Sequence, residues 1–417
     1  MKEKILAHLD DASQLESLYR SNKTAFRTSF YEIYTQIADR PQAAFWHQRL
    51  SYRSHSAAPT QQKSDLLFLV ATALLTAFLV KLPVIVGIDE DRYYPRNVSF
   101  ILFTSLLVYF ARKRRLSIMI SGAVAALLLV GALFINWLPS ADDSSTFILS
   151  CIHLPLFFWA VFGFVHTGAS SLMRWEKRPD FLRYNGDLII LVSIMTSAVM
   201  AISGITMGLF SLIGIDIGEI YFQWILVIEL SACPLVATYI LDTNPRLVSR
   251  VSPIIARIFS PVVLVTLIGY LIGMAWASKD PFNDREFLLL FNLLLIGVLA
   301  IVFFSLVELP RSSSGRGALL ITLLLSVVTI VVNSIALLAI LYRISNWGFT
   351  PNRLAVLGAN LLFFIHLILI AVQLVRQVRS KEVEFAAIEK TIAVFLPFYA
   401  GWALFVAVVV PLIFSFS

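Results

Sequence analysis

Long apolar runs dominate this chain and constrain its fold more than any other feature. A helix needs about 20 apolar residues to cross the roughly 30 Å hydrocarbon core of a bilayer. Each run must be helical, because an open strand edge cannot satisfy its backbone hydrogen bonds in lipid. The sequence therefore predicts an all-α fold, a polytopic membrane helix bundle of about 11 transmembrane helices. The runs are 66–88, 95–111, 116–138, 146–170, 187–213, 220–241, 254–278, 287–307, 317–342, 354–375 and 391–415.

The second run is the weakest of the eleven. Only Val98–Ala111 is free of charge, which gives about 21 Å of helix. It spans the membrane if Arg96 extends to the headgroups and if Tyr93 and Tyr94 lie in the interface.

The basic residues predict the orientation of these helices. With the N-terminus in the cytoplasm, 26 of the 33 Lys and Arg residues fall in cytoplasmic segments and 6 in outer loops. Basic loops stay inside, so we expect a cytoplasmic N-terminus and an outer C-terminus in a multi-pass protein. The net charge of +7 is thus an orientation signal, and we expect no nucleic-acid partner, since basic–aromatic arrays are absent.

Residues 1–63 form a separate polar segment, a cytoplasmic helical head and linker, before the transmembrane bundle of residues 64–417. The head has no glycine, and its apolar residues recur at helical spacing. We expect two or three amphipathic helices, too few for a large independent core. They either cap the inner ends of the bundle, at least over 12–50, or dock a cytoplasmic protein partner. The stripe comprises Phe26, Phe30, Ile33, Tyr34 and Ile37.

Ionisable and amide side chains within the runs are the candidate binding residues. Lys81 and Glu229 fall at similar depths, about 10–14 Å below the outer surface, and an ion pair would let both charges persist there. We expect Glu229 to face the bundle interior, with Lys81 or His153 as its partner. Alternatively, Lys81 extends to the headgroups, and amides near this depth bridge neighbouring helices. These amides are Asn292, Asn333 and Asn360.

Other residue types exclude several functions. Cys151 and Cys233 lie in apolar runs, without metal or disulfide spacing, and no hydrolase, zincin or nucleotide-binding motif is present. We therefore assign no catalytic residue, metal or cofactor. His166 and His366 are expected to be interfacial or hydrogen-bonded core residues. Five prolines can kink four of the helices, at Pro83, Pro155, Pro234, Pro397 and Pro411.

The segment 341–366 is unlike generic membrane sequence. It reads as the end of one helix, a tight outer turn and the start of the next, with Thr350 as a cap and Pro351 in the first turn. Its motif residues are Tyr342, Arg343, Gly348, Thr350, Pro351, Asn352 and Arg353.

This segment resembles the Y-R-I-x-x-x-G-[FL]-T-P-N-R pattern of a family of bacterial integral membrane proteins, known as domain of unknown function 4153. The head, with FWHQRL before the first run, is also similar to the N-terminal part of that family. The resemblance implies a polytopic protein of the bacterial plasma (inner) membrane and supplies no catalytic residues. It indicates that the outer-turn residues matter, although a purely structural turn would also explain them.

Three classes of function remain open. The first is a small-solute transporter or permease, which the helix number, short loops, kinks and intramembrane polar residues favour. The second is a membrane scaffold or signalling subunit, which binds a partner through residues 1–63 or assembles as a homo-oligomer. The third is a membrane-embedded enzyme on lipid-linked substrates, with Arg343 and Arg353 holding phosphate or carboxylate.

Overall fold

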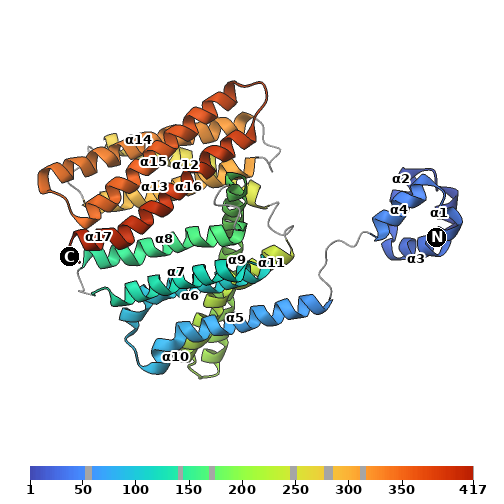
Figure 1. Cartoon of the computed structure of the whole chain (residues 1–417), viewed down its shortest axis with the longest axis horizontal. Coiled ribbons are helices and arrows are strands. Elements are labelled where there is room, and N and C mark those ends of the chain that lie inside the picture. Colours follow the sequence, from blue (N-terminus) through green and yellow to red (C-terminus); the bar gives the residue numbers. More distant parts are fainter. Residues whose placement is uncertain are drawn as a thin grey trace. The chain divides into compact units, whose positions relative to one another are not determined.

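The structure is a computed structural model in which every described element is a helix (Figure 1). It describes residues 1–51, 59–139, 144–168, 174–244, 251–276, 285–309 and 316–416. The contacts divide the chain into two compact units, Met1–Leu67 and Phe68–Ser417. The division falls inside α5 (Pro59–Val86), the helix that begins the predicted bundle.

The head consists of four short helices with a core of their own. They are α1 (Lys2–Ala7), α2 (Ala12–Ser21), α3 (Lys23–Ile37) and α4 (Pro41–Ser51). The predicted helicity of residues 12–50 is confirmed, and the head has four helices where two or three were expected. Ten buried apolar residues form its small core. Phe26, Phe30 and Trp46 are fully buried, and the rings of Phe26 and Trp46 lie 4.9 Å apart. Three bulky aromatics give this small unit a large buried area per residue.

Side-chain caps and ion pairs define the surface of the head. Asp11 and Asn22 accept backbone N–H groups at the starts of α2 and α3, which satisfies donors that have no partner inside a helix. Arg20 and Arg49 both pair with Glu16. The hydrogen bond from Arg20, followed by the bond and charge of Arg49, lowers the pKa of Glu16 from its usual value.

The second unit is a bundle of long helices. After α5 it contains α6 (Glu90–Lys113), α7 (Ile118–Trp137), α8 (Ser145–Thr167), a short 3-10 turn η2 (Trp175–Lys177), α9 (Arg178–Leu212), α10 (Gly218–Ile220), η3 (Tyr221–Leu226) and α11 (Val227–Thr243). It continues with α12 (Val251–Trp276), α13 (Arg285–Glu308), α14 (Arg316–Trp347), α15 (Pro351–Arg379), α16 (Phe385–Leu404), η5 (Phe405–Val409) and α17 (Val410–Ile413). Within the described residues, ten helices are long and apolar enough to cross a membrane. The chain is therefore an integral, multi-pass membrane protein.

Helix α6 is the predicted second run, and it falls outside those ten. It is nevertheless a continuous helix of 24 residues, about 36 Å long. It packs against α7, α8 and α11 and buries polar Arg96 and Ser105 beside Phe100 and Leu107. A helix surrounded by other helices does not need an apolar surface all round, which explains its lower hydrophobicity. Arg96 is buried between helices, so the expectation that it extends to the headgroups is wrong.

Four apolar clusters hold the described part of the bundle together, and two of them are the largest. One joins α9 and α12–α16 through residues such as Leu267, Val302 and Ile392. The other joins α5, α6, α8, α9 and α11, and Phe162 of α8 lies within it. Helix α8 contacts α6, and it also contacts α15, α16 and η5. The helices before and after it are therefore coupled through α8.

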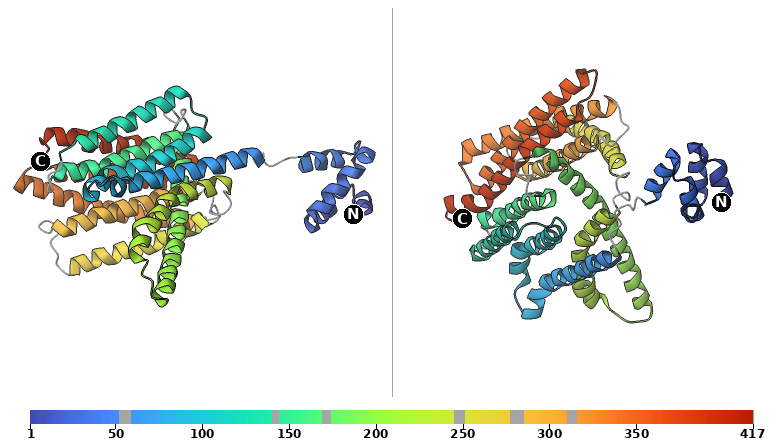
Figure 2. Two further views of the ribbon diagram at one scale, coloured as in Figure 1. Left: turned by 90° about the horizontal axis from the view of Figure 1, so that it is seen from below. Right: turned by 45° about the vertical axis from the view of Figure 1, so that its right-hand side comes forward.

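Helix α9 differs from its neighbours in direction and in burial. It runs steeply across the direction of α8 in Figure 1, and the side view of Figure 2 shows the same steep crossing. Its first turns bury Phe181 and Leu182, whereas Ile194 and Ile202 beyond them are exposed. Helix α11 runs beside it. The later turns of α9 thus present an apolar surface of the kind that contacts lipid acyl chains.

Two membrane segments contain π-helical turns, η3 before α11 and η5 after α16. Such turns are rare and often mark functional positions, because they shift the register of side chains and free backbone carbonyls. At η5 a neighbouring helix satisfies one of them: Ser150 of α8 donates to the carbonyl of Ala407 at 2.8 Å. The segment η3 has a different neighbour, Lys81.

Candidate functional site

Lys81 is buried near the C-terminal end of α5, but it does not pair with Glu229. Its side chain is 4% exposed, and its ammonium lies 5.0 Å from the ring centre of Trp224 in η3. Within the described part of the chain, Lys81 makes no hydrogen bond or ion pair. Glu229 is half-buried on α11. The expected ion pair is absent because similar depth does not fix helix rotation, and here an aromatic face meets the ammonium.

Lys81 lines a pocket of about 480 Å³ between three parts of the bundle. We call this the Lys81 pocket. Its size lies in the range typical of small-molecule sites, and its mixture of apolar walls with a few polar groups is typical as well. A cation, a carboxylate, a phenol and an amide can all contact a ligand there. The lining residues are Lys81, Val84, Glu90, Tyr94, Phe222, Gln223 and Val227.

His153 does not join this pocket. Its Nδ1 lies 2.9 Å from the carbonyl oxygen of Leu149, one turn earlier on α8. A hydrogen bond of this kind within one helix satisfies a buried imidazole without any ligand. His153 is therefore neither a partner of Glu229 nor part of the lining.

The three candidate asparagines meet between α13, α14 and α15. Asn360 donates from Nδ2 to Oδ1 of Asn292 at 2.8 Å, and its own carbonyl accepts Nδ2 of Asn333 at 3.0 Å. Asn333 and Asn360 are almost completely buried. These bonds join three helices, which is the bridging role that amides often have in membrane bundles. The trio lines neither of the two pockets described here.

The outer-turn motif builds the connection from α14 to α15. Gly348 has φ +76°, a conformation that side chains disfavour, and Thr350 accepts the backbone N–H of Arg353 to cap α15. Arg353 donates Nη1 to the carbonyls of Trp347 and Gly348, at 2.8 and 2.7 Å. A cation that binds the last carbonyls of a helix stabilises its C-terminus.

The remaining motif residues extend this turn. The guanidiniums of Arg343 and Arg353 lie 5.6 and 5.8 Å from the ring of Trp347, and the ring of Tyr342 lies edge-on to it. Asn352 donates to the hydroxyl of Ser145 at 3.1 Å, which ties the turn to the start of α8. These contacts are those of a structural turn, and they occupy Arg353 within the turn itself.

Several charged side chains that the sequence assigned to loops lie on helices and join neighbouring helices. Arg183 of α9 donates to the carbonyl of Val307 at 2.8 Å and pairs with Asp180 and with Glu389 of α16. Asp242 of α11 likewise accepts Tyr109 and Lys113 of α6. Arg183 and Lys113 stand at the basic ends of runs, so counting charges assigns them to loops. Only the packing of distant helices shows that they cross-link the bundle.

The two other membrane histidines are both buried. The sequence indicated this for His366, whereas it placed His166 at the headgroups. His366 is fully buried, and its Nδ1 lies 2.9 Å from the hydroxyl of Tyr399. His166 is surrounded by aromatic rings, and its own ring lies 4.4 Å from that of Tyr184. Neither of them lines the two pockets described here.

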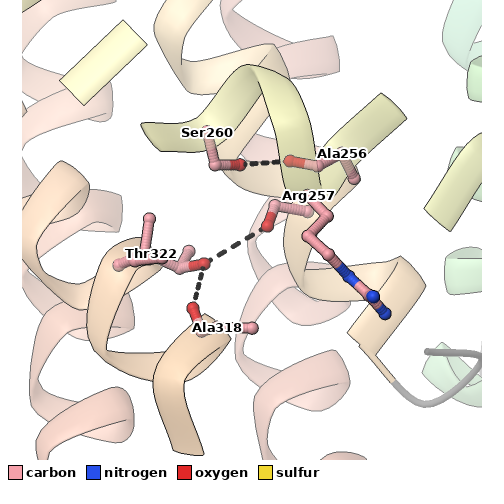
Figure 3. A pocket seen from close by; sticks show the side chains of 7 residues that line it. Ala256, Arg257, Ser260, Ala318 and Thr322 are labelled. Carbon is pink, nitrogen blue, oxygen red and sulfur yellow. Dashed lines mark hydrogen bonds between the residues drawn. The ribbon is translucent and has the colours of Figure 1, made fainter. Parts of the chain in front are cut away.

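A second pocket lies between α12, α13 and α14 (Figure 3). We call it the Thr322 pocket; it measures about 230 Å³. Thr322 donates to the carbonyl of Ala318 at 2.9 Å, and its oxygen lies 3.2 Å from the hydroxyl of Ser305. Ser260 donates to the carbonyl of Ala256 at 2.7 Å. Three helices thus converge on a small polar space, with Arg257 beside it.

No protein-family model, curated protein or solved structure matches this chain.

Proposed function

We propose that this protein is a permease for a small solute and that the Lys81 pocket binds the solute from the outer side. The observation that carries the proposal is an ammonium group, almost fully buried, that lines a cavity and forms no ion pair with a carboxylate of the described residues. In the same proposal the protein lies in a bacterial plasma membrane, with its N-terminus in the cytoplasm and its C-terminus outside. The distribution of basic residues and the resemblance of residues 342–353 to the domain of unknown function 4153 family support that orientation and source.

Electrostatics favours a solute that carries an anionic group. Lys81 lies five residues before the end of α5 at Val86, about 8 Å along the helix. A charge at such a depth is costly unless it is hydrated or paired. An incoming carboxylate or phosphate would form an ion pair with Lys81. An anionic solute would therefore bind more tightly than a neutral one. At the other walls, Glu90 can accept hydrogen bonds from the rest of the solute, and the amide of Gln223 can donate or accept them.

The backbone beside the pocket is suited to a change of conformation. Phe222 and Gln223 line the pocket from the π-helical turn η3, and α11 carries an internal proline, Pro234. Interrupted helices next to a binding site are the usual means by which transporters close one side and open the other. A permanently open site would not require such a segment.

Accessibility from both sides of the membrane tests transport directly. In a variant without Cys151 and Cys233, Gln223→Cys should react with a membrane-impermeant maleimide in intact cells. A permease alternates, so the same thiol should also react in inverted vesicles, where only the cytoplasmic side is exposed. A one-sided binding or scaffold protein would be labelled from one side alone, and that result would refute the proposal.

Two matched variants control this experiment. Ile202→Cys replaces a side chain that is 61% exposed on the apolar face of α9, and it should be labelled from neither side. Ser21→Cys, on the exposed surface of the head, should be labelled only in inverted vesicles. If Ser21→Cys instead reacted in intact cells, the proposed orientation would be wrong, independently of the result at Gln223.

The head supports a second candidate function, a scaffold that binds a cytoplasmic protein. It has its own apolar core, and Phe45 is nevertheless 59% exposed. Aromatic side chains are frequent anchors where one protein binds another. If the protein is a scaffold, Phe45→Ser should abolish its function in cells without lowering the amount of protein. If it is a permease, the Phe45→Ser variant should keep that function.

A further inference from the structure

The Thr322 pocket has a composition that the proposed permease site does not explain. Its side chains come from three helices, and three of them end in a hydroxyl group: Ser260, Ser305 and Thr322. All three residues are at least nine-tenths buried. Three convergent hydroxyls around an accessible space indicate a polar ligand.

These hydroxyls are available to a ligand. Each one now bonds within the protein, to a carbonyl one turn earlier or to a neighbouring hydroxyl. Such bonds to the preceding turn are weak, and the carbonyls keep their helical N–H partners when the bonds open. A hydroxyl hydrogen rotates freely, so each group can turn toward an acceptor in the pocket.

Arg257 adds a positive charge to the same wall. It lies one turn before Ser260 on α12, so both occupy one face of the helix. Its side chain is exposed and has no hydrogen bond or ion pair within the described residues. In Figure 3 its guanidinium extends away from the hydroxyls of the pocket. A ligand could therefore be held by hydroxyls on its inner side and by a flexible guanidinium on its outer side.

The surroundings of the pocket are apolar and exposed. Ile258 and Val262 on α12 and Leu324 on α14 are each about half exposed. The pocket lies near the start of α12, the end of α13 and the start of α14, which share one end of the bundle because all three line this pocket. Basic pockets between helices near such an end bind the headgroups of anionic lipids, and exposed apolar residues beside them suit acyl chains.

We propose that the Thr322 pocket binds a phosphate group, held by its three hydroxyls and by Arg257. The group belongs either to the headgroup of an anionic phospholipid or to a free phosphate compound. The pocket is several times larger than the roughly 30 Å³ that one water occupies, so it has room for such a group. Guanidinium and hydroxyl donors together are the usual ligands of phosphate oxygens in proteins.

The test measures binding to the purified full-length protein in a neutral detergent. Dihexanoyl phosphatidylglycerol, dihexanoyl phosphatidylcholine and inorganic phosphate are titrated separately, with the melting temperature as the readout. We expect phosphatidylglycerol to stabilise the protein at lower concentration than phosphatidylcholine. Stabilisation by inorganic phosphate at a similar concentration would identify a free phosphate compound as the source, and its absence would identify the lipid.

Variants connect binding to the pocket. Arg257→Gln should weaken phosphatidylglycerol binding by about tenfold or more, the usual effect of losing a charged hydrogen bond. Arg379→Gln makes the same charge change at an exposed position in the last turn of α15, outside the pocket, and should leave binding unchanged.

The hydroxyls are tested at Thr322. Thr322→Val should weaken binding, whereas Thr322→Ser retains the hydroxyl and should preserve it. Equal binding of the two lipids, no binding of any probe, or equal effects of Arg257→Gln and Arg379→Gln would overturn the proposal.

Discussion

Replacing Arg96 tests whether a buried cation fastens α6 into the bundle. Arg96 is 2% exposed, and its Nη1 donates to the carbonyls of Ile135, Asn136 and Leu138 at 2.8, 3.2 and 3.1 Å. These carbonyls end α7 and have no partner in their own helix. The guanidinium also lies 4.6 Å from the ring centre of Phe147. One side chain thus joins α6, α7 and α8.

The magnitude follows from what Arg96→Met removes. A hydrogen bond to a charged group contributes about 1.5–3 kcal/mol, and a partly buried cation at a helix C-terminus contributes up to about 2 kcal/mol. Against this, Nε and Nη2 are buried without a hydrogen-bond partner in the described structure, and methionine removes the cost of burying them. We therefore expect a loss of about 2–3 kcal/mol in the free energy of unfolding.

The assay is reversible unfolding of the purified protein in mixed micelles, followed by tryptophan fluorescence. Arg92→Met is the matched control, since Arg92 is exposed one turn earlier on α6 and should change stability by less than about 0.5 kcal/mol. Arg96→Lys, which keeps the charge but has fewer donors, should lie between the two. If Arg96→Met proved as stable as Arg92→Met, the C-terminal carbonyls of α7 would not depend on Arg96, and the reasoning would fail.

Three further predictions follow from single contacts. Lys81→Met should change the free energy of unfolding in the same micelles by no more than about 1 kcal/mol, because it leaves no described carboxylate without its ion-pair partner. A loss of about 3 kcal/mol would contradict this and indicate an ion pair with Lys81. Gly358→Ala should cost about 1–3 kcal/mol, because a Cβ there would lie 1.9 Å from the Trp402 ring, and Gly401→Ala, with open space around it, is its control. In isolated residues 1–51 the lowered pKa of Glu16 means that its pairing stabilises the fold above about pH 4.5. That stabilisation is lost as the pH falls through the lowered pKa, so the melting temperature, followed by circular dichroism, should fall with pH less in Glu16→Gln than in the unchanged head.

The candidate residues show how far depth along a helix can be used. The sequence placed Asn292, Asn333 and Asn360 within about a turn of one another in depth, and the structure joins them. The same reasoning placed Lys81 and Glu229 at one level, yet they do not meet. Depth follows from counting residues at 1.5 Å each, whereas contact also requires that two helices be neighbours and face each other. The asparagines satisfy this condition because α13, α14 and α15 pack together.

In the head, the sequence predicted the helices but not how they pack. The apolar stripe of α3 was predicted, since Phe26, Phe30 and Ile33 recur at helical spacing. The buried contact of Trp46 with Phe26 was not, because it depends on how α4 folds back on α3. The small core that three bulky aromatics create is therefore decided by the packing of the helices.

The sequence by itself determined that the chain is helical, that it is embedded in a membrane and which segments form its long helices. The bilayer imposes these properties on any single segment, because a backbone in hydrocarbon must satisfy its own hydrogen bonds over a fixed thickness. Only the tertiary structure decided that Arg96 caps α7, that Lys81 faces Trp224 and that Ser260, Ser305 and Thr322 surround one pocket. Those contacts depend on helix rotation and on which helices are neighbours, and both are set by side-chain packing among segments far apart in the chain.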